Sequence, residues 1–83
     1  MIMSNIEFIE PEPTMDIQSP EGTKIVFINK NGYSHEPEDA RERGLIEGET
    51  YTVDYTVVYG WTTKVYLEEF PEIPFNSVMF KKK

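Results

Sequence analysis

The sequence contains no cysteine, so neither a disulfide bond nor a thiolate metal site can stabilise the fold. A chain without cysteine weakly favours a reducing, intracellular compartment. No apolar run approaches the roughly 20 residues that a membrane-spanning helix needs. No lysine or arginine precedes Lys24, which argues against a signal or transit peptide. Together these absences predict a soluble, cytoplasmic protein.

Positive charge is also scarce, and the net charge is −7. Residues 1–22 contribute −5, because they contain no base and five acids: Glu7, Glu10, Glu12, Asp16 and Glu21. Acidic surfaces repel phosphate, so direct binding to nucleic acid is disfavoured. Two interpretations of the charge stay open. It keeps a small protein soluble, or it attracts a basic partner, including a protein that normally binds nucleic acid.

β-forming sequence is abundant in the second half of this chain, whose 83 residues make one small domain. Between Thr50 and Val58 nearly every residue is β-branched or aromatic, which predicts a strand. A tight turn at 59–61 and a second alternating segment around 65–67 complete a predicted β-hairpin. Simple alternation assigns four side chains to its apolar face: Tyr51, Val53, Tyr55 and Val57.

Residues 1–22 read as an acidic, proline-containing extension. Within it, Asn5–Glu10 has apolar residues at alternate positions, so two alternatives stay open: a mobile tail, or an edge strand added to the sheet. The edge strand is the favoured one. Met15 and Ile17 would then lie across the surface of the domain.

The remaining elements follow from local signals. The apolar run at 24–29 predicts a buried strand, and Lys30, Asn31 and Gly32 predict a turn after it. Residues 38–43 predict one or two helical turns that end at Gly44, with Leu45 and Ile46 anchored on the core. Near the C-terminus we expect a 3₁₀ turn at 74–77 and a closing strand at 78–80.

Three segments together resemble an SH3-like small barrel, in particular the short SH3-like proteins of phages and prophages. These segments are Glu47–Val53, Tyr66–Glu69 and Phe75–Phe80. The resemblance implies an all-β barrel over residues 23–83, with a short helical turn in the first long loop and a 3₁₀ turn before the last strand. It departs from the SH3 pattern in one respect. Only four strands are expected from residue 24 onward, because 70–77 is short and rich in proline. Asn5–Glu10 supplies the fifth strand, or the barrel stays open at one edge.

Catalytic and metal-binding patterns are absent from the sequence. His35, the only histidine, lies beside Glu36, Glu38 and Asp39, but one histidine among loop carboxylates is a poor match to a metal site. No serine lies in a recognisable nucleophile context. We therefore expect no enzyme activity, no metal and no cofactor.

Aromatic side chains give the best candidate site. Tyr59 and Trp61 flank the glycine of the hairpin turn, where packing into a core is difficult, and exposed Tyr and Trp commonly anchor protein interfaces. The resemblance to SH3 domains that bind proline-rich peptides adds Tyr33, Pro74 and Phe75, with acids that would orient a basic peptide residue. The alternative is that Trp61 folds back on the barrel and no groove exists. The full set of candidate binding residues is Tyr33, Glu36, Glu38, Asp39, Tyr59, Trp61, Pro74 and Phe75.

The sequence thus predicts a non-enzymatic protein-interaction module encoded by a phage or mobile element and acting on a host protein. A sharper hypothesis is an acidic inhibitor of a nucleic-acid-binding protein, and a proline-rich or basic segment is an expected ligand. Two alternatives remain. One is a nucleic-acid-associated accessory that uses Lys64 and the lysines at 81–83, and the other is a structural subunit that self-associates as a homodimer through an open sheet edge.

Overall fold

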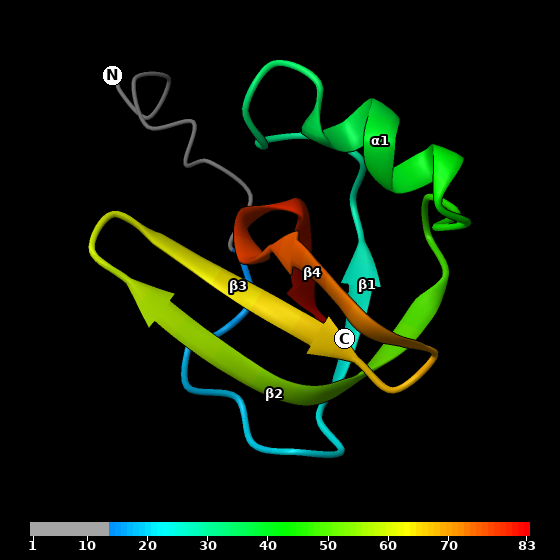
Figure 1. Ribbon diagram of the computed structural model, residues 1–83. Helices are drawn as coiled ribbons and strands as arrows, with labels where there is room; N and C mark the ends of the chain where they lie inside the picture. The colour runs from blue at the N-terminus through cyan, green and yellow to red at the C-terminus, as the bar shows by residue number, and fades with distance from the viewer. Residues whose placement is uncertain (1–13) are drawn as a thin grey trace, which may run out of the picture.

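The computed structural model describes residues 14–83, which form a five-stranded antiparallel sheet with one short α-helix. Figure 1 shows the arrangement, and the strand order is β4-β3-β2-β1-β5. The elements are β1 (Lys24–Phe27), α1 (Glu36–Glu42), β2 (Thr50–Tyr59), β3 (Thr62–Leu67), β4 (Phe70–Asn76), the 3₁₀ helix η2 (Ser77–Met79) and β5 (Phe80–Lys82). The sheet is mostly open rather than closed into a barrel, because its end strands β4 and β5 do not pair with each other. The strand expected at 5–10 lies outside the described residues.

The predicted hairpin is present as β2 and β3, but its faces differ from simple alternation. Val53 pairs with Leu67 and Tyr55 pairs with Tyr66, so Asp54 is an extra residue on β2. Such a β-bulge reverses the faces to which all later side chains point. The expectation that Tyr55 joins Val53 on the apolar face is therefore wrong.

The same reversal applies to the rest of β2. Thr56 pairs with the fully buried Val65, and directly paired residues share a face. Thr56 and Val58 thus belong to the core side, whereas Val57, which was expected there, belongs to the outer side.

The proline-rich segment at 70–76 is a strand, so the expectation of only four strands after residue 24 is wrong. Proline lacks a backbone donor and is confined to the edge of a sheet, and β4 pairs only with β3. Pro74 lies in this strand rather than in a 3₁₀ turn. The 3₁₀ helix begins at Ser77, because the Asn76 side chain accepts a hydrogen bond from the Val78 amide, 3.2 Å away. The closing strand accordingly starts at Phe80 and not at Val78.

The helical turn predicted before Gly44 is confirmed as α1. Pro37 lies in its first turn, where a missing amide hydrogen costs nothing. Gly44 ends the helix with a φ of +118°, a conformation that favours glycine. Leu45 then enters the core as expected, whereas Ile46 does not and is exposed.

The core lies between the inner face of the sheet and the segments that cross it. Phe27 and Phe80, on neighbouring strands, have ring centroids 5.7 Å apart. Met15 is buried against this cluster, and its amide donates to the Phe80 carbonyl over 2.9 Å. The other fully buried large side chains are Ile25, Val53, Val65, Leu67 and Met79.

The turn between β3 and β4 is fastened to β2 by a carboxylate. Glu69 Oε1 accepts a hydrogen bond from the Thr52 amide at 2.9 Å. Reduced solvation raises the pKa of Glu69, but the hydrogen bonds from Thr52 and the charge of Lys24 lower it, and together they outweigh the rise. The net pKa lies below the ordinary value, so the carboxylate stabilises the fold in its ionised form.

Within the described part of the chain, no helix combines the length and the apolar character needed to cross a bilayer.

Substitution of Gly44 tests the helix stop. Gly44→Ala should lower the free energy of unfolding by about 2 kcal/mol, because it adds left-handed strain and a close contact. The new Cβ would lie 3.0 Å from Phe70 Cε1. Urea denaturation measures the loss.

Two other glycines are matched controls for this substitution. Gly48 has a φ of +86° but open space around it, so Gly48→Ala isolates backbone strain and should cost about 1 kcal/mol. Gly60 has neither a left-handed φ nor a close neighbour, so Gly60→Ala should change the free energy of unfolding very little. Equal losses at Gly44 and Gly60 would contradict the proposed cause.

Candidate functional site

A cleft of about 330 Å³ lies at the free end of the β2–β3 hairpin, and we call it the tip cleft. One wall is the hairpin itself, the second is the loop before α1, and the third is η2. Residue 17, in the segment that crosses the sheet, also contributes. Its principal side chains are Ile17, Asn31, Tyr33, Val58, Trp61 and Val78.

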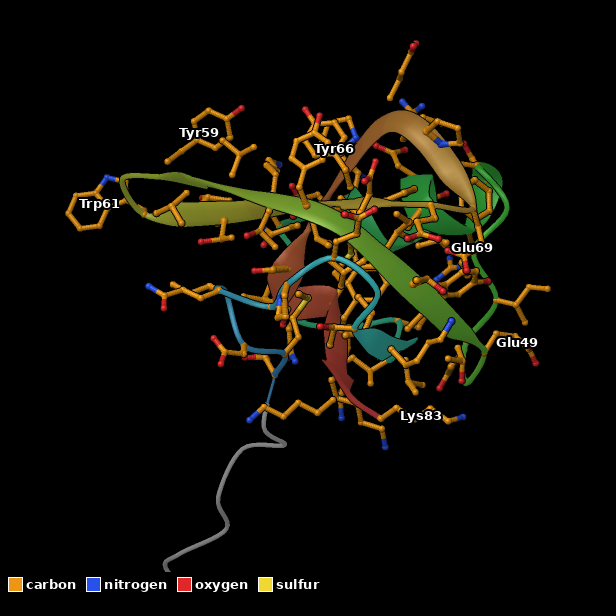
Figure 2. The ribbon with its side chains drawn as sticks, turned by 90° about the horizontal axis from the view of Figure 1, so that it is seen from below. Glu49, Tyr59, Trp61, Tyr66, Glu69 and Lys83 are labelled. Carbon is orange, nitrogen blue, oxygen red and sulfur yellow. The ribbon has the colours of Figure 1, made fainter. Side chains whose placement is uncertain are left out.

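The apolar side chains of the tip cleft are unusually exposed. Trp61 is 99 % exposed, Tyr33 is 63 % exposed and Val58 is 59 % exposed. The topology explains why. β1 pairs only with residues 50–52 of β2, so the last turn of the hairpin has no neighbouring strand on that side. Figure 2 shows Trp61 projecting from this end of the molecule. An apolar cluster without cover is typical of an interaction site.

The position of Tyr33 depends on one carboxylate, Glu36. Its Oε1 accepts hydrogen bonds from the Tyr33 amide at 2.8 Å and from Asn76 Nδ2 at 3.0 Å. Its Oε2 lies 3.4 Å from Lys64 Nζ. Residues from the loop, from β4 and from β3 thus converge on a single side chain.

Gly32 fits against this carboxylate. A Cβ at Gly32 would lie 2.9 Å from the Cβ of Glu36, so glycine allows the close approach.

The electrostatics of Glu36 favour its charged form. Partial burial raises its pKa. The hydrogen bonds from the Tyr33 amide and Asn76, with the nearby charge of Lys64, lower the pKa by more than burial raises it. The net pKa lies below the ordinary value. Glu36 is therefore an ionised anchor for the loop, which differs from the solvent-facing, ligand-orienting role that the sequence suggested for it.

A second, smaller depression of about 160 Å³ adjoins the tip cleft. Glu36, Asp39, Pro74 and Phe75 all line it, and Asn76 lines both hollows. Phe75 is nevertheless buried in the core, so little of its ring is available to a ligand.

The predicted binding residues thus fall into separate groups. Tyr33 and Trp61 meet at the tip cleft, and Glu36, Asp39, Pro74 and Phe75 surround the second depression. Glu38 is exposed on α1 and lines neither hollow. Tyr59 follows Val58 on the strand, so it points to the opposite, outer face of the hairpin.

Sequence reasoning missed several residues of the cleft. Ile17 reaches it because Thr56 Oγ1 donates a hydrogen bond to the Ile17 carbonyl at 2.9 Å. Val58 reaches it because of the bulge at Asp54. Neither contact has a local sequence signal, since both depend on residues far apart in the chain. Within residues 14–83, no group of three or more His, Cys, Asp or Glu side chains is arranged to hold a metal ion.

Removing the charge of Glu36 tests the anchor. Glu36→Gln should lower the free energy of unfolding by about 1 kcal/mol at pH 7. A group with a depressed pKa stabilises the fold above its unfolded pKa and loses that effect as the pH falls through its folded pKa. The gap between the two proteins should therefore begin to narrow as the pH falls below the unfolded pKa of about 4.3, and it should close once the pH has passed the lower pKa of the folded protein, where the native carboxyl is neutral too. Urea midpoints from pH 7 to pH 3 measure it.

Glu38→Gln is the control, because Glu38 is exposed on the same helix and its side chain makes no hydrogen bond to the described residues. It should leave the midpoints nearly unchanged. A gap between native protein and Glu36→Gln that stays constant with pH would contradict the ionised anchor.

Comparison with known proteins identifies a family. The family model of bacteriophage T4 protein Y07B matches residues 23–82, a range that contains every described strand and helix. None of the curated proteins or solved structures in the comparison matches the chain. The phage origin expected from the sequence is thereby supported. The chain belongs to the bacteriophage T4 protein Y07B family.

Proposed function

We propose that this protein is a non-enzymatic phage accessory that binds a host protein through the tip cleft in the host cytoplasm. The observation that carries the proposal is the full exposure of Trp61 beside two other exposed apolar side chains, Tyr33 and Val58. Tryptophan and tyrosine supply much of the binding energy in protein interfaces. Leaving them uncovered brings no benefit to the folded monomer.

The chemistry of the partner follows from charge and shape. A net charge of −7 favours a basic partner and accelerates encounter with it. The pair Tyr33 and Trp61 also corresponds to the aromatic groove of SH3-like barrels, so a proline-rich or basic segment is a suitable occupant. Because a basic surface often binds nucleic acid, inhibition of a nucleic-acid-binding host protein is the sharper form of this proposal.

Self-association through the sheet edges is less well supported. The edge strand β4 carries Pro71 and Pro74, and β5 has only three residues. Prolines and short length are features that protect edges from pairing. Nucleic-acid binding through the lysines at 81–83 is opposed by the acidic net charge, and fluorescence anisotropy with DNA and RNA tests it.

Trp61 provides the test, because it is the only tryptophan and its emission reports directly on the cleft. Host lysate is fractionated over immobilised protein, and the bound fraction is titrated back into free protein. Burial of the indole should shift its emission to shorter wavelength. Trp61→Ala should weaken capture by roughly tenfold or more, as for an interface hot spot. Its stability should stay within about 0.5 kcal/mol of the native value, since the side chain is exposed.

Ile46→Ala is the matched control, because Ile46 is exposed and apolar but lies outside the cleft. It should capture the same partner with unchanged affinity. Partner capture that survives Trp61→Ala, with no spectral shift in the native protein, would sink the proposal.

A further inference from the structure

The outer face of the hairpin carries a second aromatic surface, on the side opposite the tip cleft. Tyr55 on β2 and Tyr66 on β3 stack with ring centroids 4.4 Å apart and an interplanar angle of 13°. Tyr59 lies on the same face, and Figure 2 shows Tyr59 and Tyr66 on one side of the hairpin. We call these three side chains the tyrosine face.

The tyrosine face does not belong to the hydrophobic core. None of its members is in the buried cluster, and Tyr55 is 48 % exposed despite the stacking. The bulge at Asp54 directs Tyr55 to the outside. In such a stacked pair the inner faces cover each other, and the outer face of each ring stays flat and electron-rich, so it attracts cations and planar groups.

Two carboxylates border this plane. The pKa of Tyr55 is raised first by reduced solvation and then by its neighbours, among which are Asp54 and Glu72. Asp54 precedes Tyr55 at the bulge, and Glu72 is an exposed residue of β4 two positions before Pro74, which pairs with Tyr66. Neither carboxylate has an ion-pair partner among residues 14–83. Lys64, which lies on the same face of β3, is already engaged by Glu36.

We propose that the tyrosine face, with Asp54 and Glu72, binds an arginine side chain in a basic segment of the partner protein. A guanidinium stacks on aromatic rings and also donates paired hydrogen bonds to carboxylates, so one arginine satisfies both features of the surface. Lysine has a compact, strongly hydrated charge that matches only the carboxylates well. The inference rests on the proposed function, because it names the chemistry of the same partner, but it uses a different surface.

Fluorescence anisotropy with three labelled peptides of equal length tests the proposal. The peptides contain two arginines, two lysines or two citrullines in otherwise identical glycine-serine sequence. The arginine peptide should bind about fivefold more tightly than the lysine peptide, as stacking of the guanidinium on the outer face of a ring predicts. The citrulline peptide, which is planar but neutral, should show no measurable binding.

Substitutions separate the two components of the surface. Tyr55→Leu with Tyr66→Leu should weaken arginine binding about tenfold and remove the preference over lysine. Asp54→Asn with Glu72→Gln keeps the rings and should weaken binding of both charged peptides about fivefold while reducing its salt dependence. Circular dichroism verifies that both variants are folded. If the double leucine variant does not fold, the variant with Asp54→Asn and Glu72→Gln still tests the proposal.

Trp61→Ala distinguishes this inference from the proposed function. That variant should lose the partner at the tip cleft yet bind the arginine peptide as the native protein does. If the native protein captures no partner at the tip cleft but binds the arginine peptide, the proposed function fails and this inference stands. If it captures a partner but does not bind the arginine peptide, only this inference fails.

Three results would overturn the inference. The first is equal affinity for the arginine and lysine peptides, which means attraction by net charge only. The second is binding of single-stranded oligothymidine that the double leucine variant abolishes, which identifies a nucleic-acid platform. The third is that the native protein sediments as a dimer and the double leucine variant sediments as a monomer, which identifies a second copy of the chain as the occupant.

Discussion

Strand β2 has one more residue than its partner β3 at Asp54, and both exposed surfaces of the protein depend on that residue. Before it, Val53 points into the core. After it, Thr56 and Val58 take the inner side, and Tyr55 takes the outer side. Without the bulge, Tyr55 would point inward and Val58 would leave the tip cleft. A bulge also strengthens the local twist of the strand.

The second constraint is the convergence on Glu36. One carboxylate connects the loop at Tyr33 to β4 through Asn76 and to β3 through Lys64. The loop would otherwise be long, polar and poorly determined, since its own residues contribute little to the core. Its attachment is electrostatic, so the shape of the tip cleft depends on the ionisation of a partly buried acid. The core, which is apolar, does not share that dependence.

The conspicuous features of this small, acidic member of the bacteriophage T4 protein Y07B family lie on its surface. The tip cleft and the tyrosine face occupy opposite sides of one hairpin. A partner that carries an apolar segment and a basic segment could contact both sides at once, because the hairpin end projects from the rest of the sheet. Two weak contacts joined in this way give a much stronger complex than either alone.

The sequence alone determined the elements whose signals are local. The β-branched run of β2, the helical turn before Gly44 and a strand at 24–29, which spans 24–27 in the structure, were all predicted, because backbone propensity and glycine geometry act within a few residues. The sequence also indicated that Tyr33 and Trp61 would be important aromatic residues. It placed Tyr55 on the wrong face and Phe75 among ligand-binding residues, although Phe75 is buried.

Only the tertiary structure decided these last points. The bulge at Asp54 is set by the pairing of β2 with β3, not by the propensity of Asp54 itself. The proline-rich segment becomes a strand because it lies at an edge, where its missing donors need no partner. Exposure of Trp61 follows from β1 being too short to cover the hairpin end. Each outcome depends on which segments are neighbours in space, and neighbours far apart in sequence leave no local pattern.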